Sequence, residues 1–180
     1  MYKKKDSIIL IGFMGCGKST VGIKLSWKEK IPLIDTDKLI EHNTGMSVSD
    51  IFEKMGETAF RDLETNVLKE LCKQIGTRII STGGGTPVRP QNRELLRECG
   101  IVVYLRITPA SVYERLQGDT TRPLLQCEKP LERIQSLMES RQEAYEECAH
   151  IIVDVDNLSS DEVLEKIQEG VANYEKAFGN

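Results

Sequence analysis

Short runs of apolar residues recur along the chain and alternate with longer stretches that mix apolar and polar positions. The runs are rich in isoleucine and valine and are apolar at nearly every position, which is typical of parallel strands covered on both faces. The pattern therefore predicts five buried strands, at residues 7–11, 31–34, 78–81, 101–106 and 150–153.

Helical signals fill the segments between these strands. Residues 58–74 carry apolar side chains at helical spacing, and Gly76 can end that helix. Further helices can begin at Pro90 and after the N-cap residue Thr108, and residues 159–162 have the spacing of a capping box. This alternation predicts an α/β fold, a doubly wound, five-stranded parallel sheet flanked by helices, in which ligands bind beyond the carboxyl ends of the strands.

The composition is that of an ordinary globular protein. The 180 residues are 39% hydrophobic and 29% charged, and we expect a single domain spanning residues 1–180. No apolar run approaches the roughly 20 residues that cross a bilayer, and the basic residues 1–6 lead into no cleavage site. These features predict a cytoplasmic protein rather than a membrane-bound or secreted one.

Net charge and cysteine content indicate which ligands and cross-links to expect. A net charge of −4 argues against broad binding to nucleic acid, although it leaves room for a local cationic pocket. The five cysteines are odd in number and widely scattered, which indicates reduced thiols rather than a disulfide framework. Two histidines and the lack of a C-x-x-C motif predict no zinc site.

Residues 12–19 form the strongest chemical motif in the chain. Their sequence, Gly-Phe-Met-Gly-Cys-Gly-Lys-Ser, matches G-x-x-x-x-G-K-[ST], directly follows a predicted strand and enters a predicted helix. The glycines allow backbone amides to curl around phosphate oxygens, Lys18 can reach the β- and γ-phosphates, and Ser19 can bind Mg²⁺. The motif predicts a nucleoside triphosphate site; the alternative is a glycine-rich turn that binds nothing.

Two carboxylates follow the second predicted strand. Asp35 and Asp37 are two positions apart, and residues i and i+2 of a strand share a face, so both could approach a metal and an acceptor. Asp35 could hold Mg²⁺ through water, and Asp37 could orient an acceptor hydroxyl and take its proton. The alternative is that Asp37 only caps a helix that begins near Lys38.

A glycine triplet and two arginines complete the candidate site. Residues 83–85 are all glycine, which lets the backbone approach a ligand closely, although the triplet alone could also be only a turn. Arg61 and Arg141 lie on predicted helices, where arginines are usually solvated. Their planar guanidinium groups are nevertheless suited to binding a carboxylate or phosphate through two hydrogen bonds.

Two segments interrupt the simple alternation of strand and helix. Residues 35–64 hold helical pieces where a direct return to a strand is expected. Residues 117–130 are polar, contain two prolines and carry Arg122, which could close over the γ-phosphate as an arginine finger does. A loop of this length is usually a functional lid or a disordered segment.

Taken together, these residues resemble the shikimate kinases, a family of small P-loop kinases of the aromatic amino-acid pathway. The resemblance runs from Ile8 to Asp154. It implies a fold like that of the nucleoside monophosphate kinases, with residues 35–64 as a substrate-binding subdomain and residues 117–130 as a lid. It rests on residues 12–20, Asp35-Thr-Asp37, Phe60-Arg-Asp-Leu-Glu64, Gly83-Gly-Gly85, Arg122-Pro-Leu-Leu125 and Arg141-x-x-x-Tyr145.

On the acceptor side, the resemblance implies that Asp37 contacts the hydroxyl of shikimate that is phosphorylated. The carboxylate of shikimate would be bound by Arg61 and Arg141. The glycine triplet would lie at the substrate ring, with Gly84 and Gly85 nearest to it and Gly83 beside them.

On the nucleotide side, the resemblance implies that Arg122 reaches the phosphates and that Arg115 stacks on adenine. Asp35 and Ser81 would support Mg²⁺ through water, in addition to the direct ligand Ser19. The residues that would bind ATP are Gly12, Gly15, Cys16, Gly17, Lys18, Ser19, Thr20, Arg115 and Arg122.

The sequence departs from the usual family pattern in two places. Residues 26–30 stand where a glycine-ended turn normally follows the first helix, which affects local packing. Residues 154–160 follow the last strand without the basic residues and proline that often contact adenine there. The adenine contacts of this segment are therefore left unassigned.

The sequence thus predicts an ATP- and Mg²⁺-dependent kinase that phosphorylates the 3-hydroxyl of shikimate. We expect a monomer that acts on this small molecule and binds neither nucleic acid nor membrane. The alternatives are a kinase for another small hydroxylated acceptor such as gluconate or a nucleoside monophosphate, a GTPase, or a non-catalytic nucleotide-binding module. No N-K-x-D element supports a GTPase, and the presence of Lys18, Asp37 and Arg122 argues against a non-catalytic module.

Overall fold

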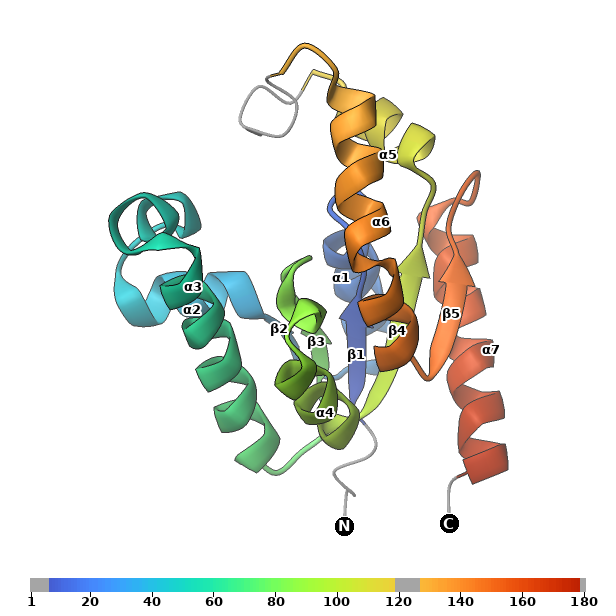
Figure 1. The fold of residues 1–180 in the computed structure, drawn as a ribbon. Coiled ribbons are helices and arrows are strands. Elements are labelled where there is room, and N and C mark those ends of the chain that lie inside the picture. Colours follow the sequence, from blue (N-terminus) through green and yellow to red (C-terminus); the bar gives the residue numbers. More distant parts are fainter. Residues whose placement is uncertain (1–6, 119–126, 179–180) are drawn as a thin grey trace.

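The computed structural model describes residues 7–118 and 127–178 of the chain. The sheet contains five parallel strands in the order β2-β3-β1-β4-β5 (Figure 1). All five predicted strands are present, with ends that differ by at most two residues from the predicted ones. The strands are β1 Ile8–Ile11, β2 Leu33–Asp35, β3 Ile79–Ser81, β4 Ile101–Arg106 and β5 Ile151–Asp154.

Helices cover both faces of this sheet, which confirms the predicted fold class (Figure 1). Alternate residues of β1 point to opposite faces: Ile8 and Leu10 belong to the apolar cluster on one face of the sheet, whereas Ile9 and Ile11 belong to the cluster on the other face. No helix in the described part of the chain is long and apolar enough to cross a membrane. The helices are α1 Lys18–Glu29, α2 Thr36–Thr44, α3 Val48–Lys73, the 3₁₀ turn η2 Thr86–Val88, α4 Pro90–Cys99, α5 Pro109–Leu116, α6 Pro130–Cys148 and α7 Ser160–Phe178.

The helix predicted at residues 58–74 begins ten residues earlier in the structure. Ser47 caps α3 in a reciprocal capping box with Asp50, and the helix is interrupted at Gly56, whose φ of 82° and ψ of 171° are not helical. This break divides α3 into two parts. The first part and α2 form a lobe that projects beyond the carboxyl end of β2 (Figure 1), so the interruption at residues 35–64 lies beside the ligand-binding edge of the sheet.

The prediction that the cysteines are unlinked is wrong for one pair. Cys72 near the end of α3 and Cys99 at the end of α4 form a disulfide, with a Cα–Cα distance of 5.0 Å. Twenty-seven positions separate the two residues, so nothing local in the sequence indicates that the two helix ends lie side by side. Cys16 and Cys148 are buried free thiols.

Candidate active site

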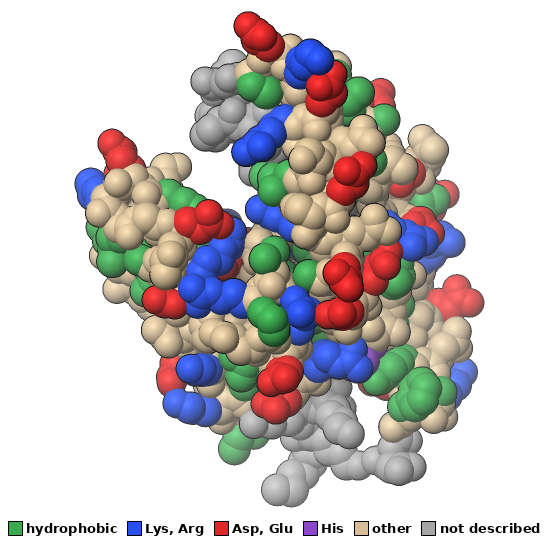
Figure 2. Space-filling model, viewed as in Figure 1, with side chains coloured by type: hydrophobic (Ala, Val, Ile, Leu, Met, Phe, Trp, Pro, Cys, Tyr) green, Lys and Arg blue, Asp and Glu red, His purple; other side chains and the backbone are tan. Residues whose placement is uncertain are grey.

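A cavity of about 810 Å³ lies beyond the carboxyl ends of β1, β2 and β3. Figure 2 shows it as a hollow between the lobe of α2 and α3 and the body of the molecule, with Lys and Arg side chains gathered along it. The structure therefore brings the predicted site residues together from segments that are far apart in sequence. The cavity is lined by Gly15, Cys16, Gly17, Lys18, Ser19, Thr20, Asp35, Asp37, Arg61, Ser81, Gly83, Gly84, Gly85, Arg115 and Arg141, among others.

Among the described residues, one predicted site residue, Gly12, does not line this cavity. Gly12 is the first residue of the loop and packs against β4, where a Cβ would come within 2.7 Å of the Leu105 carbonyl oxygen and 2.8 Å of Cys16 Sγ. Gly12 therefore has a packing reason to be glycine. Arg122 and the central part of the predicted lid, residues 119–126, lie outside the described residues.

The loop of residues 12–17 has the backbone conformation that its glycines allow. Gly15 and Gly17 have φ values of 78° and 97°, in the left-handed region that other residues rarely adopt. Helix α1 begins directly after Gly17, and no side chain caps its first turn. The amides at this helix end are therefore available to an anion, and the helix dipole favours one there.

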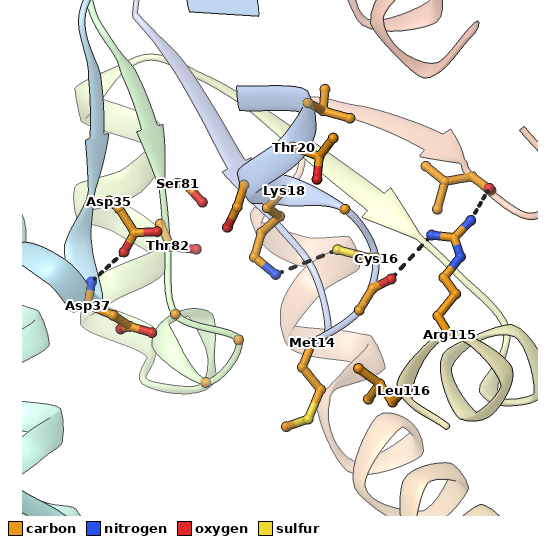
Figure 3. A pocket seen from close by; sticks show the side chains of 18 of the residues that line it. Met14, Cys16, Lys18, Thr20, Asp35, Asp37, Ser81, Thr82, Arg115 and Leu116 are labelled. Atoms are coloured by element: carbon orange, nitrogen blue, oxygen red, sulfur yellow. Dashed lines mark hydrogen bonds between the residues drawn. The ribbon is translucent and has the colours of Figure 1, made fainter. Parts of the chain in front are cut away.

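Lys18 lies across its own loop. Its Nζ donates hydrogen bonds to the carbonyl oxygens of Gly12 (2.7 Å) and Phe13 (3.1 Å), and it is 3.6 Å from Cys16 Sγ (Figure 3). These contacts hold the ammonium group on the cavity side of the loop. A bound phosphate would compete with the two carbonyls, and a charged acceptor binds an ammonium more strongly than a neutral one does.

Asp35 and Ser81 are the last residues of neighbouring strands and are direct partners in the parallel register. Their side chains lie on the same side of the cavity, facing the region of Lys18 (Figure 3). Asp35 Oδ1 accepts hydrogen bonds from the amides of Asp37 (3.0 Å) and Lys38 (3.1 Å) and thereby caps α2. The alternative that Asp37 is the helix cap is therefore wrong, because Asp35 fills that position.

Asp37 lies in the first turn of α2 and not on a strand, so the expectation that strand alternation aligns the two carboxylates is also wrong. Its Oδ1 is buried and has no hydrogen-bond partner among the described residues. Burial, followed by the charges of Asp35 and Glu64, raises the pKa of Asp37 to about 6, although Lys18 opposes the shift. A buried acceptor atom without a donor is costly, and this cost adds to the preference of the Asp37 carboxyl for its protonated form.

The glycine triplet allows three close approaches. A Cβ on Gly83 would lie 2.7 Å from Asp37 Oδ1 and 2.8 Å from Glu64 Oε1, and a Cβ on Gly85 would overlap the Arg61 guanidinium. Gly84 lies between the phosphate loop and Arg141, and its carbonyl accepts a hydrogen bond from the Tyr145 hydroxyl. Gly83 and Gly85 are therefore required by contact with the site, and the reading of the triplet as only a turn is insufficient.

Arg61 is held by two carboxylates and is largely removed from solvent, since its side chain is 13% exposed. Its Nη1 donates to Glu64 Oε2 at 2.7 Å, and its Nη2 donates to Glu57 Oε1 at 3.1 Å. Burial alone would lower the pKa of Arg61, but the adjacent Glu64 raises it, so the guanidinium stays charged. Arg141 faces the same cavity from α6, with its guanidinium carbon 5.7 Å from the Phe13 ring centroid.

Glu64 is a buried residue of the candidate site to which the sequence assigned no role. It is only 1% exposed, and it contacts Arg61 through one oxygen and the Thr86 hydroxyl through the other. Its position three residues after Arg61 on a helix is the signal that could have indicated this pairing.

The far end of the cavity lies between the phosphate loop and the segment after β5. Arg115 connects the two, because its guanidinium donates to the carbonyls of Gly15 (3.2 Å) and Val155 (3.0 Å) (Figure 3). The segment after β5, which the sequence left unassigned, contributes apolar wall instead of basic residues. Val155, Leu158 and Val163 line the cavity there together with Leu116.

Comparisons with known proteins show to which family the chain belongs. The family model described as shikimate kinase matches residues 14–172. The chain belongs to the shikimate kinase family. The predicted family resemblance is thereby confirmed, and the match continues past β5 into α7.

Individual relatives agree with the family model. The chain is 46% identical over 162 residues to a shikimate kinase of Thioalkalivibrio sulfidiphilus, which covers 90% of this chain and 85% of that protein. It is also 46% identical over 164 residues to a shikimate kinase of Enterococcus faecalis, covering 90% and 96%. The solved structure of a shikimate kinase from Acinetobacter baumannii in complex with shikimate is 37% identical and superimposes with a TM-score of 0.86 over 94% of both chains.

Proposed function

We propose that the chain transfers the γ-phosphate of ATP to the 3-hydroxyl of shikimate. The observation that carries this proposal is the carboxylate of Asp37, which lines the same cavity as the phosphate loop and two arginines and whose pKa is raised to about 6. An acceptor hydroxyl that donates to this carboxylate from the cavity would lie between Asp37 and the phosphate loop. This is the arrangement that transfer of a phosphoryl group to an alcohol requires.

The acceptor would be fixed by its carboxylate as well as by its hydroxyl. Arg61 and Arg141 face the cavity from α3 and α6, and a planar guanidinium binds a carboxylate through parallel hydrogen bonds. The backbone at Gly84 can come close to the acceptor ring because it carries no side chain. An anionic, hydroxylated acceptor fits this set of groups better than a neutral one.

The phosphate chain of ATP would lie on the amides at the start of α1, with Lys18 at its terminal phosphates. Adenine would lie at the far end of the cavity, against Arg115 and the apolar wall formed by Leu116, Val155 and Leu158. Arg122, predicted from the sequence to reach the phosphates, completes the set of positive charges in this proposal. Phosphoryl transfer depends mainly on such alignment and neutralisation, because its transition state is loose and carries its charge on peripheral oxygens.

The residues present also fit Mg²⁺. Ser19, Asp35 and Ser81 all offer hard oxygen donors to the cavity, and Asp35 and Ser81 are held in register by the sheet. Ser19 would bind the ion directly, and the other two through water, as suits an ion that retains much of its hydration. When bound with ATP, Mg²⁺ would neutralise charge on the β- and γ-phosphates.

Asp37 would aim the acceptor hydroxyl and take up its proton. A carboxylate with a pKa of about 6 holds a proton more readily than one with the ordinary value, and it remains mostly ionised at neutral pH. The substrate-binding subdomain (residues 35–64) and the predicted lid (residues 117–130) would enclose the acceptor. They would thereby exclude water as a competing phosphate acceptor. Cytoplasmic localisation and a monomeric state remain predictions.

Release of ADP by the purified protein, measured over a panel of acceptors with ATP and Mg²⁺, tests the proposal. We expect turnover with shikimate and little with gluconate or a nucleoside monophosphate. Turnover with gluconate or a nucleotide, and none with shikimate, would overturn the acceptor assignment. ATP binding without ADP release for any acceptor would favour a non-catalytic module.

A further inference from the structure

A buried chain of hydrogen bonds connects α4 to Arg61 in the candidate site. Asn92 on α4 accepts a hydrogen bond from Thr65 Oγ1 (2.8 Å) and donates one to the carbonyl oxygen of Thr86 (2.9 Å). The Thr86 hydroxyl donates to Glu64 Oε1 at 2.5 Å, and Glu64 Oε2 accepts from Arg61 Nη1 at 2.7 Å. Glu64, Thr65, Thr86 and Asn92 are each at most 4% exposed, so water is excluded from this chain.

The two oxygens of Glu64 have different partners, and this division has a consequence for Arg61. Thr86 occupies Oε1, so only Oε2 is directed at the guanidinium. If Oε1 lost its donor, the buried carboxylate could turn and accept from Arg61 through both oxygens, which is the favoured geometry of an arginine–carboxylate pair. Such a pair would take up N–H groups that a ligand carboxylate needs.

The position of Thr86 is itself tightly determined. It directly follows the glycine triplet, and its amide donates to the Gly83 carbonyl at 3.1 Å, which closes the turn. Asn92 holds the carbonyl of Thr86 from the other side and is in turn oriented by Thr65. Thr65 lies one helical turn after Arg61, and its single hydroxyl proton is shared between Asn92 Oδ1 and the Arg61 carbonyl oxygen, which is 3.0 Å from Thr65 Oγ1. The chain of contacts therefore begins and ends at Arg61.

We propose that Thr86 is a positioning residue that acts through Glu64 to keep the Arg61 guanidinium directed at the acceptor, with Asn92 holding Thr86 in place. The inference rests on the proposed function, because it assigns Arg61 to an acceptor carboxylate. It predicts a loss of acceptor binding when the hydroxyl of Thr86 is removed, although Thr86 itself touches no substrate in this proposal.

Thr86→Val tests this role, because it keeps the shape of the side chain and removes only the hydroxyl donor. We expect KM for shikimate to rise about 10-fold, the scale of a weakened charged hydrogen bond, with KM for ATP within about twofold of the wild type. Thr86→Ser restores the donor and should return KM for shikimate to within about threefold of the wild type. A merely structural defect would lower the melting temperature without separating the two KM values.

Thr77→Val is the matched control. The Thr77 hydroxyl is also buried, but among the described residues it has no hydrogen-bond partner, and it lies outside the cavity. This variant should leave both KM values unchanged. If Thr86→Val does not fold, Thr86→Ala provides the same loss of donor without placing an additional methyl group beside Glu64.

The outcomes are distinguishable. Equal increases in both KM values, no increase at all, or failure of Thr86→Ser to restore shikimate binding would overturn the positioning role while leaving the proposed function intact. Absence of shikimate turnover in the wild-type protein would overturn both. A selective rise in KM for shikimate in Thr86→Val, reversed in Thr86→Ser and absent in Thr77→Val, would establish the role.

Discussion

The two halves of the cavity are built in different ways. The phosphate half is built around the loop of residues 12–17 and the start of α1, whose backbone conformation follows from the glycines of the loop and from the helix that begins at Lys18. The acceptor half is assembled from α2, α3, the loop after β3 and α6, and its groups are placed by contacts between these elements. The first half is therefore encoded locally, whereas the second depends on packing over the whole chain.

This difference predicts that single substitutions act differently in the two halves. In the phosphate half, a side chain acts on ATP almost alone, so its loss should affect catalysis directly. In the acceptor half, each side chain is supported by a buried neighbour, so effects should spread along the network and appear first in acceptor binding. Single substitutions in each half, each with a matched control, test that separation.

Lys18→Met should nearly abolish transfer. The substitution removes the one positive charge that the loop directs at the terminal phosphates, and we expect kcat to fall by about 10²–10³-fold or more. Lys24→Met on the same helix is the control, because Lys24 is paired with Asp161 at 2.7 Å and does not line the cavity. Near-normal turnover of Lys18→Met would show that the loop does not act on the transferred phosphate.

Asp37→Asn should lower kcat by about 10²-fold while both substrates still bind. The amide can still accept a hydrogen bond from the acceptor hydroxyl, but it cannot take up the proton. Steady-state kinetics with each substrate varied in turn should therefore show a change in kcat with KM values within a few-fold of the wild type. An unchanged kcat would remove Asp37 from the mechanism and leave its unpartnered oxygen without a function.

Arg61→Ala should mainly raise KM for shikimate, by about 10- to 100-fold, because it removes charged hydrogen bonds to the acceptor and leaves Glu64 unpaired. Arg89→Ala serves as the control: Arg89 also bonds a carboxylate from α3, Asp62 at 2.6 Å, but lies outside the cavity. An effect on KM for ATP alone would contradict the division of the cavity into two halves.

The same difference explains how much of the molecule could be predicted from its sequence. The strands follow from their apolar runs, and the phosphate loop follows from residue type and spacing within nine positions, because each is determined by local stereochemistry. The early start of α3 was missed because Gly56 interrupts the helical pattern, although Ser47 and Asp50 cap a helix before it.

The features that the sequence could not predict depend on contacts between segments that are far apart in the chain. Glu64 is buried only because Arg61 and Thr86 both reach it, and Cys72 meets Cys99 only because two helix ends pack together. Asp35 became the helix cap because β2 ends at that residue, which moved Asp37 from a strand face to a helix turn. Spacing identified both aspartates as candidates, but their division of roles depends on where the strand stops.

The smallest expected effect concerns the stability of the fold and comes from the buried carboxylate of Asp37. The pKa of Asp37 is raised from its ordinary 3.8 to about 6, so the folded protein holds this proton more tightly than the unfolded chain does. Stability contributed by the protonated form is therefore lost as the pH rises from about 4 to about 6, and ionised Asp37 destabilises the fold at neutral pH.

Asp37→Asn should therefore be more stable than the wild type even though it is less active. At pH 8 we expect the free energy of unfolding to increase by about 1–2 kcal/mol, less than the full conversion of the pKa shift because the carboxylate borders an open cavity. The gain should fall to roughly half at pH 5, as measured by urea denaturation. Asp35→Asn should show no such gain, because Asp35 Oδ1 already accepts two amide hydrogen bonds. Equal stabilisation by both variants would mean that general repulsion between acidic groups, and not the unpartnered oxygen of Asp37, destabilises this part of the fold.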